Sequence, residues 1–330
     1  MSKHLKIASL FLADFQARSG VANGAFMIEL QSLQQLEQKL NQVILGKPQA
    51  VRLALCCLLS EGHLLIEDLP GLGKTTLAHA LALSLGMQYK RVQFTNDMLP
   101  ADLLGQSVFL PETQEFQFRP GAIFSQILLA DEINRASPRT QSALLEAMEE
   151  HQVSVDGQTY ALPQPFFVIA TQNPLFHAGT HALPESQLDR FLMRLTLGFP
   201  DLQTEKLMLQ QDLGNSRLEG LTPCLDQNQL IGLQQQVVQV KVSDALLDYL
   251  LALISQSRQQ QDGLPLSPRA AKALLRATKA FALLCGRYFA TAEDVQQVFA
   301  SVAEHRLNPG HASDSKSLSL QLLRQVPCPL

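Results

Sequence analysis

The spacing of apolar residues changes once along the chain, near Pro200. Before that point, short apolar runs alternate with stretches in which apolar residues recur every three or four positions. Short runs are typical of buried strands, and the longer spacing is typical of amphipathic helices. Beyond it, only the helical spacing continues. We therefore expect an α/β unit over 27–200, with a parallel sheet core flanked by helices, followed by an all-α unit over 201–310.

The same pattern predicts the individual elements. Helices are expected at 28–43, 49–60, 77–85 and 139–150, and then at 204–212, 226–239, 243–260, 268–284 and 291–305. Strands are expected just before residue 68 and at 89–94, 107–110, 115–118, 127–130, 152–155, 159–162, 166–170 and 192–199. The two ends lack this pattern, so we expect a weakly patterned extension over 1–26, with Met27 as an alternative start, and a flexible tail over 311–330.

A phosphate-binding loop is predicted where the first apolar run meets a helix. The junction reads Asp68-Leu69-Pro70-Gly71-Leu72-Gly73-Lys74-Thr75-Thr76. Backbone N–H groups at a glycine turn and at a helix N-terminus attract phosphate. Lys74 would reach the β- and γ-phosphates, and Thr75 would bind Mg²⁺. Asp68 departs from the strict pattern, which has glycine there, and an ordinary strand–turn–helix with a solvated lysine is the alternative.

Two adjacent acids, Asp131 and Glu132, end the apolar run 127–130. Side chains at the carboxyl end of a buried parallel strand commonly face a binding site. Asp131 is expected to hold Mg²⁺, directly or through water, and Glu132 to orient and polarise an attacking water. A surface turn with two solvated carboxylates is the alternative. The phosphate loop weighs against it, because a phosphate loop and a metal-binding acid each require the other.

A polar segment, 171–174, also follows a predicted strand. Within it, Asn173 is placed to hydrogen-bond a γ-phosphate or the attacking water, because it follows the carboxyl end of its strand. An ordinary Asn-Pro turn is the alternative.

Composition narrows the class of partner. The chain has 330 residues, 46% of them hydrophobic, which is enough for about two domains with a sizeable core. A net charge of -4 and the lack of a Lys/Arg cluster argue against a nucleic-acid partner. No apolar run approaches the length of a membrane span. The 5 scattered cysteines and the lack of a convincing signal peptide favour free thiols and a cytoplasmic location.

Several stretches occur in a characteristic order along 28–307. The most specific are 65–75, 129–136 with its continuation 140–148, and 170–174; further matches lie at 93–95, 118–121, 188–191, 267–270 and 305–306. Together they resemble the MoxR-type AAA+ ATPases, of the group that carries an insert in helix 2. That family commonly has an aspartate at the position of Asp68, so the departure from the strict pattern is typical of it.

The resemblance implies an AAA+ P-loop NTPase fold with a C-terminal all-α lid domain. Residues 95–119 would form the helix-2 insert, and residues 150–163 would form the insert before the residue called sensor 1. Arg135 is characteristic of the family, and a structural ion pair is the simplest role for it.

The resemblance also implies roles that spacing alone does not show. Asn173 would be sensor 1. Arg190 matches the arginine finger, which acts on the nucleotide of a neighbouring subunit. Arg269 would be the sensor-2 arginine of the lid, and would neutralise the triphosphate together with Lys74.

The implied activity is hydrolysis of ATP to ADP and phosphate with Mg²⁺. By resemblance, the chain would act as a homo-oligomeric ring, usually a hexamer, that remodels or matures a client with a von Willebrand factor A domain. One alternative is a regulatory module that binds nucleotide without turnover. A nucleic-acid motor is the other, because replicative helicases share the helix-2 insert. The first is opposed by the intact set of site residues, which comprises Lys74, Asp131, Glu132, Asn173 and Arg190. The second is opposed by the net charge and by the lack of a Lys/Arg cluster.

Overall fold

A five-stranded parallel sheet forms the centre of the α/β unit in the computed structural model, which describes residues 23–173, 181–210, 218, 220–309 and 317–329. Its strands are β1 (Leu64–Glu67), β2 (Tyr89–Gln93), β5 (Ile127–Asp131), β8 (Phe167–Gln172) and β9 (Met193–Leu195). They lie in the order β2-β5-β8-β1-β9, and every neighbouring pair is parallel. All five strands therefore end along one edge of the sheet.

The central strands are buried on both faces, as parallel strands generally are. Leu64 and Ile66 of β1 join the larger hydrophobic core, whereas Leu65 between them joins the smaller one. This alternation follows from the pleat, which turns successive side chains to opposite faces. The larger core includes α2 (Asn23–Val43), α3 (Pro48–Leu59) and α4 (Lys74–Ser84). The smaller core includes α5 (Pro100–Leu104) and α6 (Pro138–Glu150).

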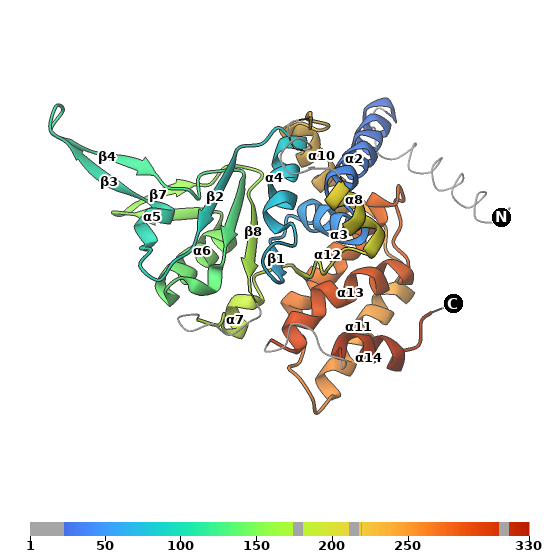
Figure 1. Cartoon of the computed structure of the whole chain (residues 1–330). Coiled ribbons are helices and arrows are strands. Elements are labelled where there is room, and N and C mark those ends of the chain that lie inside the picture. The colour runs from blue at the N-terminus through green and yellow to red at the C-terminus, as the bar shows by residue number, and fades with distance from the viewer. Residues whose placement is uncertain (1–22, 174–180, 211–217, 219, 310–316, 330) are drawn as a thin grey trace.

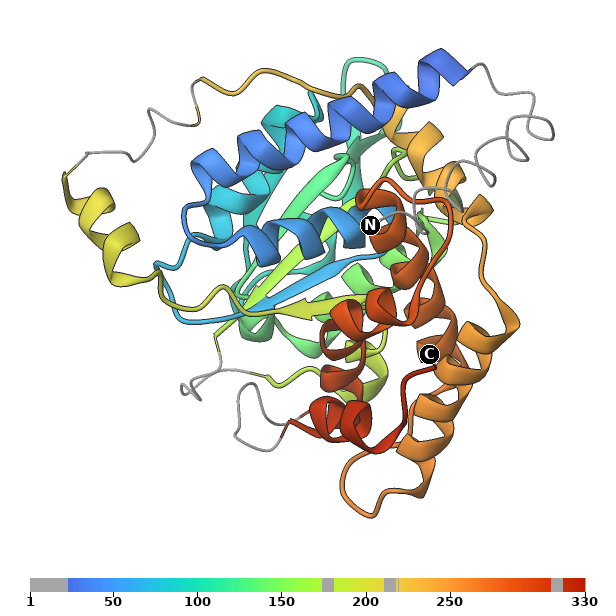
Figure 2. The ribbon, with the colours of Figure 1, turned by 90° about the vertical axis from the view of Figure 1, so that its right-hand side faces the viewer.

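The C-terminal helices extend the larger core. They are α10 (Gln227–Gln239), α11 (Asp244–Gln259), α12 (Pro268–Leu284), α13 (Ala292–Leu307) and α14 (Leu318–Gln325). Figure 2 shows α11–α14 (orange to red) beside α2 and α3 (blue), which cover one face of the sheet. Buried residues of α10–α14 belong to the same hydrophobic cluster as those of α2 and α3. The helical part is thus packed directly on the α/β unit.

Two antiparallel hairpins interrupt the α/β order, and each is built from two of the strands that the sequence predicts. β3 (Gly105–Leu110) pairs with β4 (Glu115–Pro120), and β6 (Gln152–Val155) pairs with β7 (Gln158–Ala161). The β3–β4 hairpin extends away from the sheet (Figure 1). Phe118 stacks on Tyr160 with ring centroids 3.9 Å apart, which ties the two hairpins together.

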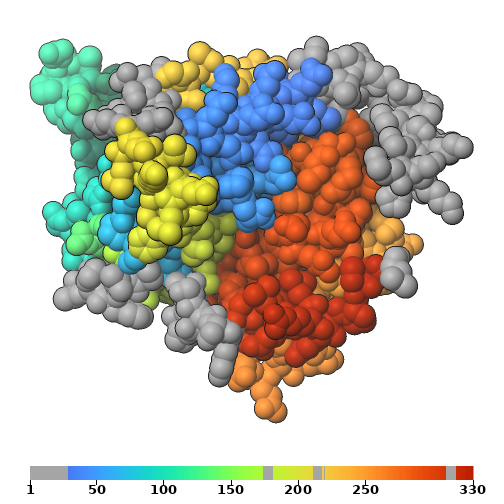
Figure 3. Space-filling view, turned by 45° about the vertical axis from the view of Figure 1, so that its right-hand side comes forward, coloured from blue at the N-terminus to red at the C-terminus, as the bar shows by residue number. Residues whose placement is uncertain are grey.

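Helix α8 (Leu202–Gln210) lies on the surface and contributes no buried residue. It is visible in yellow in Figure 3. Among the described helices, none is both long and apolar enough to cross a membrane.

The C-terminal tail differs from its prediction. Residues predicted to be flexible within 311–330 include helix α14, which buries Leu318 and Leu322. The Glu304 carboxylate accepts hydrogen bonds from the backbone N–H groups of Leu318 (3.2 Å) and Ser319 (2.9 Å). The Ser and Pro content of the tail obscures the helical spacing of its few leucines. At the other end, α2 begins at Asn23, ahead of the predicted start at 28, and residues 1–22 lie outside the described part of the chain.

Candidate active site

Three predicted site segments meet at the carboxyl edge of the sheet. Strands β5, β8 and β1 are consecutive neighbours, so the residues that follow them lie side by side. The phosphate loop follows β1, Glu132 follows β5, and Asn173 follows β8. The sequence predicts each segment separately, and the strand order brings them together.

The phosphate loop has the backbone that its glycines require. Gly71 and Gly73 have φ of 83° and 92°, in the left-handed region that favours glycine. A Cβ atom at either position would meet nothing within 4 Å, so both glycines face open space. Gly73 caps α4 without a side-chain hydrogen bond, which leaves the first N–H groups of the helix available for an anion.

Lys74 faces the carboxyl groups of the site. Its Nζ donates a hydrogen bond to the backbone oxygen of Asp68 at 2.5 Å. Burial lowers the pKa of Lys74, while the nearby carboxylates of Asp68, Asp131 and Glu132 partly oppose that shift. A bound phosphate would compensate for the lost solvation, because it supplies negative charge next to the ammonium group.

Asp68 anchors the loop where the strict pattern has a glycine. One carboxylate oxygen accepts hydrogen bonds from the N–H groups of Leu197 (2.7 Å) and Gly198 (2.6 Å), which follow β9. The other oxygen accepts a hydrogen bond from the N–H of Leu69 at 2.9 Å. Asp68 therefore fixes the start of the loop to the neighbouring edge strand, a contact that a glycine could not make.

Both oxygens of the Asp131 carboxylate have partners. Oδ1 accepts a hydrogen bond from the Thr171 hydroxyl at 2.5 Å. Oδ2 accepts two from Arg91, at 2.6 Å from Nη2 and 3.2 Å from Nε. Sequence reasoning missed Arg91, since no motif marks an arginine in the middle of β2.

Glu132 is held from two sides in this conformation. Its backbone has φ of 57°, and its Oε2 accepts hydrogen bonds from Gln93 and Arg135, both at 2.8 Å. Arg135 thus forms an ion pair with Glu132. The sequence predicts an ion pair for Arg135 but not its partner. Asn173 is half-buried nearby, and its backbone oxygen lies 3.5 Å from the side-chain amide of Asn134.

The donor atoms at this edge fit Mg²⁺. Thr75 in the first turn of α4 offers a hydroxyl, and Asp131 offers a carboxylate. Among the described residues, no group of three or more His, Cys, Asp or Glu side chains could hold a metal ion together. One hydroxyl and one carboxylate suit a metal whose remaining ligands are phosphate oxygens and water, as is usual for Mg²⁺.

A pocket of about 420 Å³ opens at the end of β9, where Leu197 contacts Asp68 at the start of the phosphate loop. It is lined by residues 46–50 before and within α3, by 194–197 at the end of β9, and by Ala300, Ser301 and Glu304 of α13. Leu197 lines this pocket and also donates its backbone N–H to the Asp68 carboxylate. Its three walls come from distant parts of the chain, which is why sequence reasoning missed the pocket.

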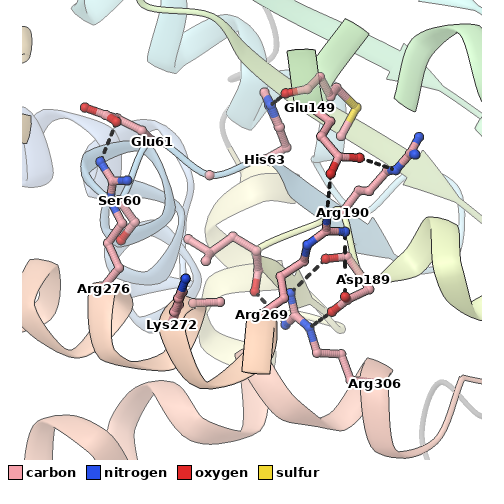
Figure 4. Close-up of a pocket in the computed structure, with 14 residues that line it drawn as sticks. Ser60, Glu61, His63, Glu149, Asp189, Arg190, Arg269, Lys272, Arg276 and Arg306 are labelled. Carbon is pink, nitrogen blue, oxygen red and sulfur yellow. Dashed lines mark hydrogen bonds and ion pairs between the residues drawn. The ribbon is translucent and has the colours of Figure 1, made fainter. Parts of the chain in front are cut away.

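The two predicted arginines lie at the opposite edge of the sheet. Arg190 and Arg269 line a pocket of about 290 Å³ with Ser60, Glu61 and His63, which precede β1 (Figure 4). The phosphate loop follows the other end of β1. That strand has 4 residues, so about 13 Å separates the two edges. The sequence predicts that Arg269 and Lys74 neutralise the same triphosphate. In the structure, the two residues lie at opposite edges of the sheet and do not meet.

Carboxylates hold the arginines of this second pocket. Glu149, at the end of α6, forms ion pairs with Arg190 at 3.0 Å and with Arg269. Asp189 lies 3.9 Å from Arg269 and 2.6 Å from Arg306. Arg306 is buried and also donates to backbone oxygens, including that of Phe191 at 2.8 Å, so its role is structural.

Comparisons with known proteins agree with this architecture. Residues 63–193 match the ATPase family associated with various cellular activities (AAA), and residues 259–323 match the AAA lid domain. The uncharacterised protein YeaC of Bacillus subtilis is 45% identical over 82% of this chain and 85% of its own. Chaperone MoxR1 of Mycobacterium tuberculosis is 35% identical over 88% of this chain and 79% of its own. The crystal structure of a proposed ATPase from Cytophaga hutchinsonii, 29% identical, has a TM-score of 0.85 and covers 96% of this chain and 100% of that one.

Proposed function

The chain belongs to the MoxR family of AAA+ ATPases, and from this premise we propose that it hydrolyses ATP in an oligomeric ring that remodels or matures a partner protein. The observation that carries the proposal is the meeting of Lys74, Asp131, Glu132 and Asn173 at one edge of the sheet, around a glycine loop. Each group there has a part in phosphoryl transfer, which depends on positioning and on neutralising charge.

The residues at this edge have separate parts in binding and hydrolysing the triphosphate. The N–H groups of the loop and the Lys74 ammonium bind the β- and γ-phosphates. Thr75 and Asp131 hold Mg²⁺, which when bound neutralises charge on the phosphate oxygens. Glu132 orients the attacking water, and Asn173 contacts that water or the γ-phosphate. Before this can happen, Glu132 has to leave the hydrogen bonds from Gln93 and Arg135.

The pocket at the end of β9 is the proposed site of the adenine base and ribose. Its volume suits a nucleoside, and Leu197 connects it to the start of the phosphate loop. One of its walls is α13 of the lid, so nucleotide binding would bridge the lid and the α/β unit.

The ring proposal is supported by the position of the arginines. Arg190 and Arg269 are both about one strand length from the phosphate loop of their own chain. In a head-to-tail ring, the amino edge of one sheet can face the carboxyl edge of the next. Both arginines would then act on the neighbour's nucleotide, and an arginine supplied in this way is worth about 10³–10⁵ in rate in well-studied phosphoryl-transfer enzymes.

The proposed client is a protein with a von Willebrand factor A domain, as the family resemblance implies. The name chaperone, carried by the relative from Mycobacterium tuberculosis, supports a remodelling role. Exposed Phe109 and Phe116 on the projecting β3–β4 hairpin offer an apolar contact for such a client.

Glu132→Gln tests the proposed reaction. We expect ATP binding to persist and turnover to fall at least about a hundredfold, because the amide cannot polarise the water. Binding is measured with a fluorescent ATP analogue, and turnover by phosphate release. Glu146→Gln, which removes an exposed acid from α6, is the matched control and should leave turnover unchanged.

Equal turnover in Glu132→Gln and wild type would exclude Glu132 as the water-orienting residue. Tight ATP binding with no turnover in the wild type would favour a regulatory module instead. The same Glu132→Gln variant, held in its ATP state, is suited to capture the client.

A further inference from the structure

We propose that Arg91 is a positioning residue that neutralises Asp131 while the metal is absent, gives way when Mg²⁺ arrives with nucleotide, and passes this exchange to Glu132 through Gln93. The inference rests on the proposed ATPase function. No motif in the sequence assigns Arg91 a role, and the geometry around Asp131 does.

Arg91 occupies Oδ2 of Asp131, which is the oxygen that a new ligand would take. Oδ1 is already taken by the Thr171 hydroxyl, and Thr171 is itself fixed because it accepts a hydrogen bond from the N–H of Glu132 at 2.9 Å. Oδ2 receives the Arg91 guanidinium through two N–H groups. A divalent cation brought to Asp131 would meet this guanidinium, and like charges at that range repel. Arg91 and Mg²⁺ therefore compete for one carboxylate.

The two partners differ in their freedom to move. The Asp131 side chain is 12% exposed and lies at the end of a buried strand, whereas the Arg91 side chain is 49% exposed. Arginine can swing its charged head into water while its stem stays in place. In the exchange, Arg91 moves and Asp131 stays where the metal needs it.

Gln93 connects this exchange to Glu132. Arg91 and Gln93 are two residues apart on β2, so their side chains share a face of the strand. Arg91 Nη2 donates to Gln93 Oε1 at 3.2 Å, and Gln93 Nε2 donates to Glu132 Oε2 at 2.8 Å. The guanidinium thus turns the amide so that its NH₂ group faces Glu132. When Arg91 leaves, that orientation loses its support, and the hold on Glu132 weakens.

The test compares how much Mg²⁺ strengthens ADP binding in wild type and in Arg91→Gln. Affinity for a fluorescent ADP analogue is measured by titration in excess Mg²⁺ and in EDTA, so no turnover is involved. We expect the ratio of the two dissociation constants to be about three- to fivefold larger in the variant, the range for loss of a half-exposed ion pair. Arg91→Lys should fall between them, because it keeps the charge and loses the paired N–H groups.

Lys90→Gln is the matched control. It removes one positive charge from the adjacent, exposed position of β2, where Lys90 contacts the Gly121 backbone oxygen at 3.4 Å. Its Mg²⁺ ratio should equal that of wild type. An unchanged ratio in folded Arg91→Gln would overturn the proposal and leave a purely structural ion pair. Failure of the wild type to bind ADP at all would count against the proposed function instead.

A double-mutant cycle tests the connection to Glu132. If Arg91 acts on Glu132 through Gln93, the change in kcat caused by Arg91→Gln should disappear in a Gln93→Met background. Gln93→Met alone should change the Mg²⁺ ratio less than Arg91→Gln does, since it removes one hydrogen bond to Arg91 and neither of the two that Arg91 makes to Asp131. Fully additive effects on kcat would overturn the relay.

Discussion

His63 is a neutral imidazole buried between β1, β8 and α6. Its Nδ1 accepts a hydrogen bond from the Val168 N–H at 3.0 Å, and its Nε2 lies 3.2 Å from the backbone oxygen of Met148, to which it donates. Both ring nitrogens are therefore used in the neutral form. Burial lowers the pKa of His63 from 6.5 to about 4, because the charged form would lose its hydration. The sequence shows a histidine before a strand and nothing of this burial.

Stability should fall in acid because of His63. In the unfolded chain the imidazole binds a proton near pH 6.5, whereas in the folded protein it does so only near pH 4. Between these values the unfolded state holds more protons, so the free energy of unfolding decreases as pH falls from 6.5 to 4, by up to about 3 kcal/mol. Urea unfolding across this window measures the slope.

His63→Gln supplies the comparison for that slope. The variant should be less stable at pH 7, yet lose less stability between pH 6.5 and 4. His305, whose pKa burial also lowers, contributes equally to both proteins. Parallel curves for wild type and variant would show that His63 is not the titrating group.

At the level of elements, α14 shows how a short helix is stabilised by its surroundings. It has 8 residues, fewer than an isolated helix needs to be stable in water. Glu304 of α13 caps its first turn, and Leu322 is fully buried against the larger core. The lid match also runs to residue 323, past the predicted end of the lid at 310. Tertiary contacts, rather than local propensity, create this helix.

Leu322→Ala should destabilise the protein by about 2–3 kcal/mol, the lower part of the range for a buried leucine replaced by alanine. Leu320→Ala in the same helix is the control. Leu320 is 49% exposed, so its loss should change the free energy of unfolding by less than about 0.5 kcal/mol. Thermal and urea unfolding of both variants provide the measurement. Equal effects of the two substitutions would mean that α14 is not packed as described.

The sequence predicts most elements of the α/β unit, because their apolar periods are strong. Strand β6 is predicted residue for residue, and the other long strands differ by one or two positions at their ends. Helix α5 is missed because 5 residues are too few to show a helical period. Strand β9 is shorter than the predicted 192–199, because the chain turns to receive the Asp68 carboxylate at Leu197 and Gly198.

On the scale of the whole molecule, the two edges of the sheet carry different charged groups, which in the proposed ring would be complementary halves of one site. The carboxyl edge has the phosphate loop and the acids, and the amino edge has Arg190 and Arg269. The two edges of one chain lie about a strand length apart, so in the proposed ring a neighbouring chain would complete the site. Glu149 and Asp189 neutralise the arginines in the isolated chain, and a neighbour's phosphates would replace them on assembly.

Mixing inactive variants should restore activity if the halves meet between chains. The Lys74→Ala variant lacks a working phosphate loop but can still supply its arginines to a neighbouring chain. The Arg190→Ala variant has an intact phosphate loop but cannot supply the arginine finger. An equal mixture should recover about a quarter of the wild-type ATPase rate, since one interface in four would pair intact halves in a head-to-tail ring. Phosphate release after mixing and reassembly measures the recovery.

Two further mixtures sharpen that experiment. Lys74→Ala with Glu132→Gln should recover nothing, because both defects lie on the same edge. Lys74→Ala with Arg269→Ala should recover activity if Arg269 also acts on the neighbour. No recovery with Arg269→Ala would indicate that Arg269 acts on the nucleotide of its own chain.

Local sequence alone predicts which chemical groups the proposed site contains. The glycine turn, Lys74, Asp131 and Glu132 each follow an apolar strand directly, so their places are set by a few neighbouring residues. Only the tertiary structure decides what faces them. Strand order puts Arg91 of β2 beside Asp131, and the parallel direction of the strands puts Arg190 and Arg269 at the far edge. Such pairings depend on contacts between segments distant in sequence, which no local pattern encodes.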